Sequence, residues 1–292
     1  MSSATGALIC ADLDRTLIYS AAALALDGAD ADGPSLLCVE LYQGKPQSFM
    51  LTSAAAALEQ LAQQAVFVPT TTRTVEQYDR VQLPGRIPRY AICANGGRLL
   101  VEGKPDGDWS AHVARELQGC APVAEVRALL ERAPPFVRTL RVASGLFVYA
   151  VVDREAMPGS WLAELSGSCG ERGWSVSVQG RKVYCVPNLL RKSSAAAEVC
   201  RRTGAHRMLA AGDSLLDTDL LLAADLAIRP RHGELHHTGW SAPRLAVTEC
   251  SGVQAGAEIV QWLSAKCARA NPYTLSGSSR PVRTSDEGTQ CC

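Results

Sequence analysis

Two carboxylates separated by one residue follow the first apolar run of the chain. The run covers residues 7–11, and Asp12 and Asp14 come directly after it, with Thr16 two residues further on. Because loops at the carboxyl ends of parallel strands line the ligand crevice of an α/β sheet, both carboxylates can reach that crevice. One can then act as a nucleophile and the other as a general acid and base. A plain turn after a strand accounts for the same residues, so the pair alone does not decide the chemistry.

Hydroxyl and cationic side chains that could bind phosphate stand after a later apolar run and before a later helical stretch. Thr71, Thr72 and Arg73 follow the apolar run 65–68, and a hydroxyl there can donate to a phosphate oxygen. Lys192 stands directly before a helix-like stretch, where its charge and the helix N-terminus can both neutralise phosphate. Taken singly, a capped helix start explains the threonines and a solvated surface position explains the lysine.

An acidic loop follows the apolar run 208–211. Gly212 makes the turn, and Asp213 and Asp217 stand four residues apart behind it. Mg²⁺ prefers oxygen ligands and binds through one or two carboxylates while keeping several waters. The loop therefore predicts a magnesium site.

The elements that must position these residues indicate an α/β fold. Continuous apolar runs at 7–11, 65–68, 90–94 and 208–211 are typical of strands buried on both faces of a parallel sheet. Between them, residues 53–64 and 193–203 have helical composition. Both stretches start with serines that can cap, and the second stops at Gly204. A repeated strand–helix order predicts a Rossmann-like core with helices on both faces.

The middle of the chain predicts an inserted α+β domain. Residues 136–152 resemble two strands around Ser144-Gly145, and residues 174–186 alternate around a turn at Gln179-Gly180. We expect core segments at 1–84 and 188–268 and a cap domain at 85–187. A smaller insertion at 20–50 carries a hairpin over 36–51. The Ser-, Gly- and Pro-rich segment 269–292 is predicted to be a disordered tail.

The composition limits the classes of binding partner that the chain is expected to have. Lys and Arg number 29, as do Asp and Glu, so a neutral chain gives no global electrostatic reason to bind nucleic acid or a membrane surface. The 11 cysteines show no CxxC spacing, which argues against a zinc site and for reduced thiols in a cytoplasmic protein. A small-molecule substrate is the expected partner, and the oligomeric state stays open.

The order of these features resembles the haloacid dehalogenase-like (HAD) superfamily of aspartate-nucleophile phosphotransferases. Four motifs match in sequence order, which is far more specific than any one of them. They are DxDxT at Asp12, Asp14 and Thr16, the second-motif hydroxyl at Thr71, the lysine at Lys192, and GDxxxD at Asp213 and Asp217.

The long stretch between Thr71 and Lys192 has room for a type-two cap, and three narrower resemblances refine this. Asn95-Gly96 resembles the segment near the cap entry of the Cof-like branch. Residues 69–74 are similar to the second motif of mannosyl-3-phosphoglycerate phosphatases, with Arg73 where that branch has Lys. Thr72 stands where Gly is usual, which leaves the second-motif hydroxyl open by one position. Taken together, residues 14–16, 71–74 and 229–233 also resemble HAD proteins encoded with tellurite-resistance genes.

The resemblance implies a Mg²⁺-dependent phosphatase that acts on a small phosphorylated metabolite. Asp12 would form an aspartyl-phosphate and Asp14 would act as acid and base, while Thr71 and Lys192 would hold phosphate oxygens, beside Thr72, Arg73, Asn95 and Gly96. Mg²⁺ would be held by Asp12, the Asp14 carbonyl and Asp213, with Asp217 orienting a metal-bound water or Lys192.

Two alternatives stay open. One is a phosphomutase or phosphotransferase on the same fold, and the other is a non-catalytic, stress-associated binding module. Substrate choice is expected from cap residues, among them Arg138, Arg141, Arg181, Lys182 and Tyr184.

Overall fold

A five-stranded parallel sheet forms the centre of the protein. The computed structural model describes residues 6–26, 33–131 and 135–268. The strand order is β14-β13-β12-β1-β4, and every neighbouring pair is parallel. The strands are β1 (Ala7–Ala11), β4 (Val66–Pro69), β12 (Arg207–Ala211), β13 (Leu226–Arg229) and β14 (Leu245–Val247). All five residues of β1 are buried, as expected for a strand covered on both faces. The predicted parallel α/β core is confirmed.

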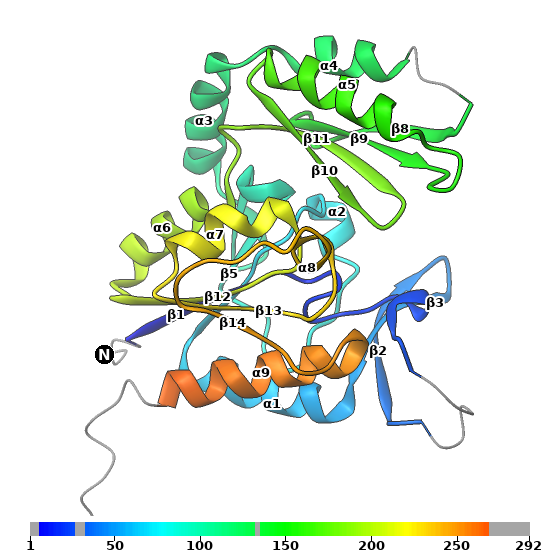
Figure 1. The fold of residues 1–292 in the computed structure, drawn as a ribbon. Helices are drawn as coiled ribbons and strands as arrows, with labels where there is room; N and C mark the ends of the chain where they lie inside the picture. The colour runs from blue at the N-terminus through cyan, green and yellow to red at the C-terminus, as the bar shows by residue number, and fades with distance from the viewer. Residues whose placement is uncertain (1–5, 27–32, 132–134, 269–292) are drawn as a thin grey trace, which may run out of the picture.

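Helices cover both faces of this sheet (Figure 1). On one face lie α1 (Thr52–Gln64) and α9 (Gly252–Ala268), and on the other lie α6 (Lys192–Thr203) and α7 (Thr218–Ala223). In α1 the buried residues Ala54, Leu58 and Leu61 recur at helical spacing, so one stripe faces the sheet.

The predicted serine caps are wrong. The residues that precede the first turns of α1 and α6 are Leu51 and Arg191, and neither makes a side-chain cap bond. The carboxylate of Asp219 instead accepts a hydrogen bond from the Ser193 amide at 2.8 Å, so a neighbouring helix satisfies this terminus. The predicted end of α6 is confirmed, because Gly204 adopts φ +69°.

The run at residues 90–94 does not simply extend the parallel sheet. The strand β5 (Tyr90–Cys93) pairs antiparallel with β6 (Arg98–Val101), which pairs with β7 (Lys104–Pro105). A single parallel bridge between Thr70 and Ile92 links β5 to the end of β4. Periodicity could not reveal this change, since a buried strand is apolar in either kind of sheet.

A four-stranded antiparallel sheet, the cap sheet, lies beyond the core (Figure 1). Its order is β10-β11-β9-β8, with β8 (Val137–Ala143), β9 (Phe147–Val152), β10 (Trp174–Gln179) and β11 (Lys182–Pro187). Both predicted hairpins are present, with Gly145 and Gly180 at positive φ in the turns. The helices α4 (Val123–Glu131) and α5 (Gly159–Gly170) lie on its outer side, and α3 (Gly107–Glu116) stands at its edge. The exact domain limits at residues 84 and 187 stay a prediction.

A hairpin projects beside the carboxyl end of the core sheet. Its strands are β2 (Leu36–Tyr42) and β3 (Lys45–Leu51), at the predicted place. The remaining helices are short, namely η1 (Ala21–Ala23), α2 (Val75–Tyr78), η3 (Ala94–Gly96), η4 (Leu117–Gly119), η5 (Leu215–Asp217) and α8 (Glu234–His237). The predicted tail at 269–292 lies outside the described residues.

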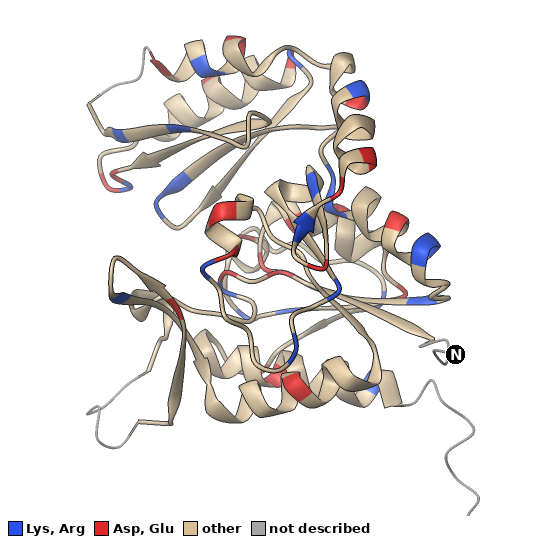
Figure 2. Ribbon diagram, turned by 180° about the vertical axis from the view of Figure 1, so that it is seen from behind, with Lys and Arg blue, Asp and Glu red and all other residues tan. Residues whose placement is uncertain are grey.

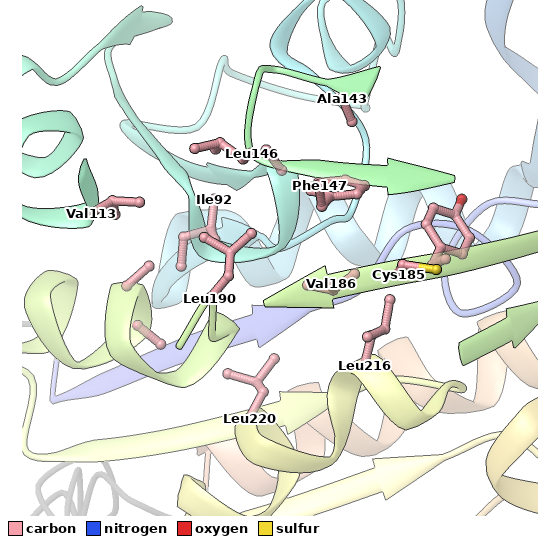
Figure 3. Close-up of a cluster of buried hydrophobic side chains, with 14 of the residues drawn as sticks. Ile92, Val113, Ala143, Leu146, Phe147, Cys185, Val186, Leu190, Leu216 and Leu220 are labelled. Carbon is pink, nitrogen blue, oxygen red and sulfur yellow. The ribbon is translucent and has the colours of Figure 1, made fainter. Parts of the chain in front are cut away.

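One hydrophobic cluster runs from the core into the cap sheet (Figure 3). Ile92 of β5, with Leu190 and Leu220 of the core, belongs to the same cluster as Phe147 and Val186 of the cap sheet. Charged residues of both signs are interspersed over both parts (Figure 2). Among the helices of the described residues, none has the length and apolar character needed to cross a bilayer.

The carboxylate of Glu234 joins the cap sheet to the core. It accepts hydrogen bonds from the Ser177 hydroxyl at 2.7 Å and the Val178 amide at 2.8 Å, both in β10. It also accepts from the Leu215 amide of the core at 2.9 Å. Because β10 is an edge strand, its outward amide is free to bond in this way.

We therefore expect Glu234→Ala to loosen the cap sheet from the core. Hydrogen bonds to a charged group are among the stronger ones, so exchange of the Val178 amide with solvent should accelerate about tenfold or more. Hydrogen–deuterium exchange read at β10 measures this. Glu125→Ala on the exposed face of α4 is the matched control, and unchanged exchange in Glu234→Ala would contradict the expectation.

Candidate functional site

The site begins where β1 ends in the middle of the sheet. The Asp12 amide donates to the Ala211 carbonyl at 2.9 Å, which continues the β1–β12 pairing into the loop. Asp12 and Thr16 are buried, and the Tyr19 hydroxyl donates to the Thr16 carbonyl at 3.1 Å. The loop therefore holds the Asp12 carboxylate at the carboxyl end of the strand, as the sequence predicts.

Lys192 lies fully buried between two carboxylates. Its Nζ donates to Asp12 Oδ1 at 2.7 Å and to Asp217 Oδ1 at 2.5 Å. Burial alone would lower the pKa of Lys192, but the two carboxylates outweigh it and raise the pKa above its ordinary value. The lysine is therefore charged, and the solvated surface position considered for it is excluded.

Asp217 folds back onto the end of β12. Its Oδ2 accepts hydrogen bonds from the Asp213 and Ser214 amides, at 3.1 and 2.9 Å, and from the Ser214 hydroxyl at 2.8 Å. Gly212 permits this approach, since a Cβ there would lie 2.5 Å from the Asp217 side chain. Both oxygens of Asp217 are thus engaged, one by Lys192 and one by the loop.

Three buried carboxylates form a group that fits a cation. Oxygens of Asp12, Asp213 and Asp217 lie within 4.8 Å of one another. Burial, opposed by Lys192 and reinforced by Asp217, raises the pKa of Asp12 to about 7. Burial and the charges of Asp12 and Asp217 raise the pKa of Asp213 well above its ordinary value. Burial is the largest cause of both shifts, and the neighbouring carboxylates add to it. A cation there would offset both effects, and an all-oxygen set suits Mg²⁺.

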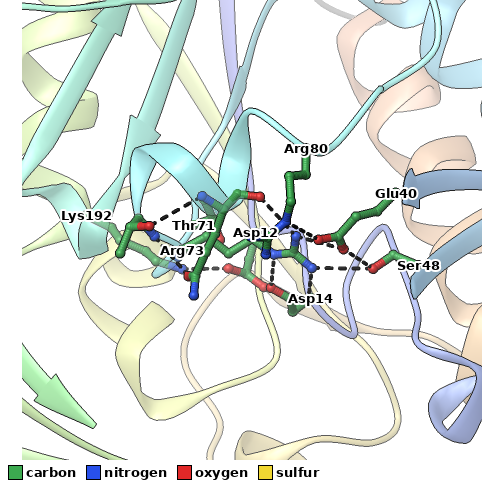
Figure 4. Close-up of polar contacts among 10 residues, drawn as sticks. Asp12, Asp14, Glu40, Ser48, Thr71, Arg73, Arg80 and Lys192 are labelled. Atoms are coloured by element: carbon green, nitrogen blue, oxygen red, sulfur yellow. Dashed lines mark hydrogen bonds and ion pairs between the residues drawn. The ribbon is translucent and has the colours of Figure 1, made fainter. Parts of the chain in front are cut away.

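Asp14 points away from this group toward Arg73 (Figure 4). Arg73 donates to both Asp14 oxygens, from Nε at 2.7 Å and from Nη2 at 2.8 Å, in the two-pronged geometry of an arginine–carboxylate pair. Burial acts to raise the pKa of Asp14, but the bonds from Arg73 lower it below its ordinary value. Asp14 is therefore ionised in this state.

Arg73 also reaches the β2–β3 hairpin (Figure 4). Its Nη1 lies 2.9 Å from Glu40, a buried residue that also accepts from Ser48 at 2.6 Å and pairs with Arg80 at 3.2 Å. The hairpin is thereby tied to Asp14 through a single guanidinium.

The other predicted phosphate-binding residues lie buried around the start of α6. The Thr71 hydroxyl accepts from the Arg73 amide at 3.1 Å, and the Asn95 amide donates to the Thr71 carbonyl at 3.0 Å. The Asn95 side chain donates to the Leu190 carbonyl at 2.9 Å. Gly96 adopts φ +92°, and any Cβ there would collide with the Arg191 carbonyl. These residues pack the Thr71 loop against the segment that carries Lys192, while Thr72 lies buried beside them.

His232 holds the backbone of the loop after β1 at Arg15. The Nε2 of His232 lies 2.7 Å from the Arg15 carbonyl, so it must donate, and Nδ1 accepts from the Gly252 amide at 3.1 Å. Burial lowers the pKa of His232, in keeping with this neutral form. Arg15, at φ +64°, places its Nε 3.5 Å from Asp213.

Sequence reasoning missed Glu40, Ser48, Arg80, Arg15 and His232. Glu40 and Ser48 sit on a hairpin whose alternating pattern gives no sign that its polar residues are buried. His232 lies within residues 229–233, which entered the sequence analysis only through a family resemblance and without a role of its own. The predicted residues Asp12, Lys192, Asp213 and Asp217 are brought together, whereas Asp14 faces a separate network.

Comparisons with solved structures identify proteins that have a similar fold. No protein-family model matches the chain, and no curated protein matches it. Among solved structures, the sucrose-phosphatase of Synechocystis, in complex with sucrose and phosphate, matches with a TM-score of 0.62 and 16% identity, over 88% of this chain and 98% of that one. The trehalose-6-phosphate phosphatase C-terminal domain of C. albicans matches with a TM-score of 0.54 and 11% identity, over 89% and 93%.

A HAD subclass IIB sugar phosphatase also matches, with a TM-score of 0.53 and 12% identity, over 89% of this chain and 98% of that one. At such identities the likeness concerns the fold. The chain has the fold of HAD-superfamily phosphatases with a cap, and the resemblance indicated by the four motifs is confirmed at that level.

We expect Lys192→Met to destabilise the protein strongly. Removing one partner of a buried ion pair leaves uncompensated charge, which costs about 3–5 kcal/mol. Here two carboxylates lose their cation. Urea unfolding without divalent cations measures the change, and Lys266→Met on α9 is the control. A loss below about 1 kcal/mol would show that the carboxylates need no cation from the chain.

Proposed function

We propose that this chain is a Mg²⁺-dependent phosphatase that hydrolyses a small phosphorylated metabolite through an aspartyl-phosphate on Asp12. The observation that carries the proposal is the buried Asp12–Lys192–Asp217 arrangement with Asp213 beside it, at the carboxyl end of a parallel sheet. Lys192 pairs with two of these carboxylates, and Asp213 lies beside them without such a bond. Buried ionisable groups with shifted pKa values in a crevice are typical of functional sites.

Asp12 is the proposed nucleophile. One of its oxygens would attack phosphorus as the bond from phosphorus to the leaving oxygen breaks. Lys192 holds Oδ1 of this carboxylate at 2.7 Å, so the side chain has a fixed direction. A carboxylate suits the role because its phosphoryl ester is reactive enough to be hydrolysed in a second step.

Asp12 and Asp213 are the side chains proposed to hold Mg²⁺, with the Asp14 carbonyl. Bound there, the ion would supply the positive charge that offsets the repulsion between the Asp12 carboxylate and the phosphate. Asp217 has both oxygens engaged, so we assign it to orienting Lys192 and the acidic loop.

Asp14 is the proposed acid and base. It would give a proton to the leaving oxygen, and then take one from the water that attacks the phosphoenzyme and frees Asp12. Arg73 keeps Asp14 ionised in the free chain. A phosphate anion entering beside Asp14 brings negative charge that favours its protonated form, so ligand entry prepares the acid.

The phosphate oxygens would be bound by Lys192 and the Thr71 loop. Thr71, Thr72 and Arg73 border the same end of the sheet, and Asn95 and Gly96 fasten this loop to the start of α6. The neighbours in fold include a sucrose-phosphatase and a sugar phosphatase, which favours a phosphosugar or similar substrate. The link to tellurite resistance stays a prediction.

The test is phosphate release from sugar, nucleotide and glycerate phosphates, with Mg²⁺ or EDTA, by wild type and Asp12→Asn. We expect release that needs Mg²⁺ and falls at least a thousandfold in the variant, the scale on which a nucleophile contributes. Circular dichroism checks that Asp12→Asn is folded. Activity retained in the folded variant would disprove the nucleophile, and a folded wild type silent across the panel would favour the phosphomutase or the binding module.

Asp14→Asn should lower kcat more for substrates with poor leaving groups than for substrates with good ones. An alkyl or sugar oxygen needs a proton on departure, whereas an aryl oxygen leaves more easily, so kcat should fall about 10²–10⁴-fold for sugar phosphates and much less for phenyl phosphate. Steady-state kinetics on both substrates give the comparison. Equal losses on the two would count against the acid role.

A further inference from the structure

A small cavity opens beside Asp14, away from the Asp12 group. It has a volume of about 200 Å³ and is lined by the loop after β1, the β2–β3 hairpin, α2 with the residues on either side of it, and the first residue of β11. We call it the hairpin cavity. Drug-sized ligands occupy about 300–1,000 Å³, so this cavity suits a single small ring or a short chain.

The hairpin that forms one wall is held firmly. The backbones of Tyr19 and Phe49 exchange two hydrogen bonds at 2.8 Å, which fasten β3 to the segment just after the Asp14 loop. The Gln82 amide donates to the Val39 carbonyl at 2.7 Å and fastens β2 to the chain beyond α2. A wall anchored on both strands can hold side chains at fixed positions.

Every side chain that lines the hairpin cavity carries a hydrogen-bonding group, and no aliphatic side chain occurs among the described residues that border it. A larger cavity of about 580 Å³ borders Asp213 instead, and there Leu162, Val176 and Leu215 contribute aliphatic surface. The two sides of the catalytic group thus differ sharply in chemistry.

The polar side chains of the hairpin cavity differ in whether they already have hydrogen-bond partners. Arg73, Glu40 and Ser48 are engaged with one another, and Asp14, Gln77 and Arg80 also have partners. The side chains of Tyr42, Gln47 and Lys182 reach the same cavity, and within the described part of the chain none of them makes a hydrogen bond. The Tyr42 ring lies against the Arg80 guanidinium at 4.7 Å, which fixes its orientation.

We propose that the hairpin cavity receives the leaving group of the substrate, and that Tyr42 and Gln47 of the β2–β3 hairpin select a small hydroxylated leaving group such as one sugar ring or a short polyol. The inference rests on the proposed function, since the acid must stand beside the leaving oxygen and Asp14 borders this cavity. An amide and a phenol both donate and accept, as hydroxyl groups require.

Selectivity would then be shared between the cap and an insertion in the core. Of the cap residues expected to read the substrate, Lys182 borders the hairpin cavity, whereas Arg138 pairs with Asp153 on an exposed surface at 2.9 Å. Lys182 faces the hairpin from the cap and would contact a ligand oxygen on its outer side. A leaving group without hydroxyls would leave these polar groups unpaired, which penalises it.

The experiment compares two kinds of substrate in the full chain with Mg²⁺. Erythrose 4-phosphate, ribose 5-phosphate and glucose 6-phosphate offer hydroxylated leaving groups, and phenyl phosphate offers none. The readout is the ratio of kcat/KM for the best sugar phosphate to kcat/KM for phenyl phosphate. We expect Gln47→Ala and Tyr42→Phe each to lower this ratio about five- to tenfold, the scale of one neutral hydrogen bond.

Gln60→Ala on the exposed face of α1 is the matched control, and it should leave the ratio unchanged. A ratio unchanged in both hairpin variants, or a wild type that prefers phenyl phosphate to every sugar phosphate, would overturn the leaving-group site while the phosphatase stands. A folded wild type that hydrolyses neither kind of substrate would overturn both proposals.

Discussion

The structure depends on one buried cation. Lys192 joins three segments that are far apart in the sequence, because its ammonium contacts Asp12 after β1 and Asp217 after β12 while its backbone begins α6. A buried ammonium needs such partners, and buried carboxylates need the ammonium. The surrounding backbone follows from this pairing, since Gly212 and Gly96 each admit a close approach that a Cβ would prevent. The residues that hold the buried charges therefore also determine how the surrounding backbone packs.

A second cation, Arg73, joins two carboxylates that lie outside the Lys192 group. Arg73 binds Asp14 with two nitrogens and reaches Glu40 with a third, so one planar guanidinium connects the acid to the hairpin. A lysine could not replace it, because a single ammonium does not offer that forked set of donors. The hairpin and Asp14 are therefore held by the same guanidinium.

The sequence predicted the residues whose spacing is local, and missed those that depend on tertiary contacts. Asp12, Lys192, Asp213 and Asp217 each stand at the end of a recognisable apolar run or the start of a helix, and a parallel sheet brings such ends together. Glu40 could not be found in this way, because its burial arises only when the hairpin docks on Arg73. The serine caps failed for a similar reason, since a carboxylate from another helix satisfies the terminus of α6. The boundaries of the cap depend on which strands pair, and periodicity does not encode pairing.

Glu234 connects the cap sheet to the loop that carries Asp217. Glu234 binds two groups of β10 and also the Leu215 amide, and Leu215 opens the short helix that ends at Asp217. Separating the cap sheet from the core breaks the first two bonds and leaves that carboxylate to the acidic loop alone. Since Asp217 in turn holds Lys192, the position of the cap and the order of the charged group are linked through consecutive contacts. The Ser177 and Val178 bonds to Glu234, the Leu215 amide, Asp217 and Lys192 therefore form one continuous series of contacts between the cap sheet and the buried charged group.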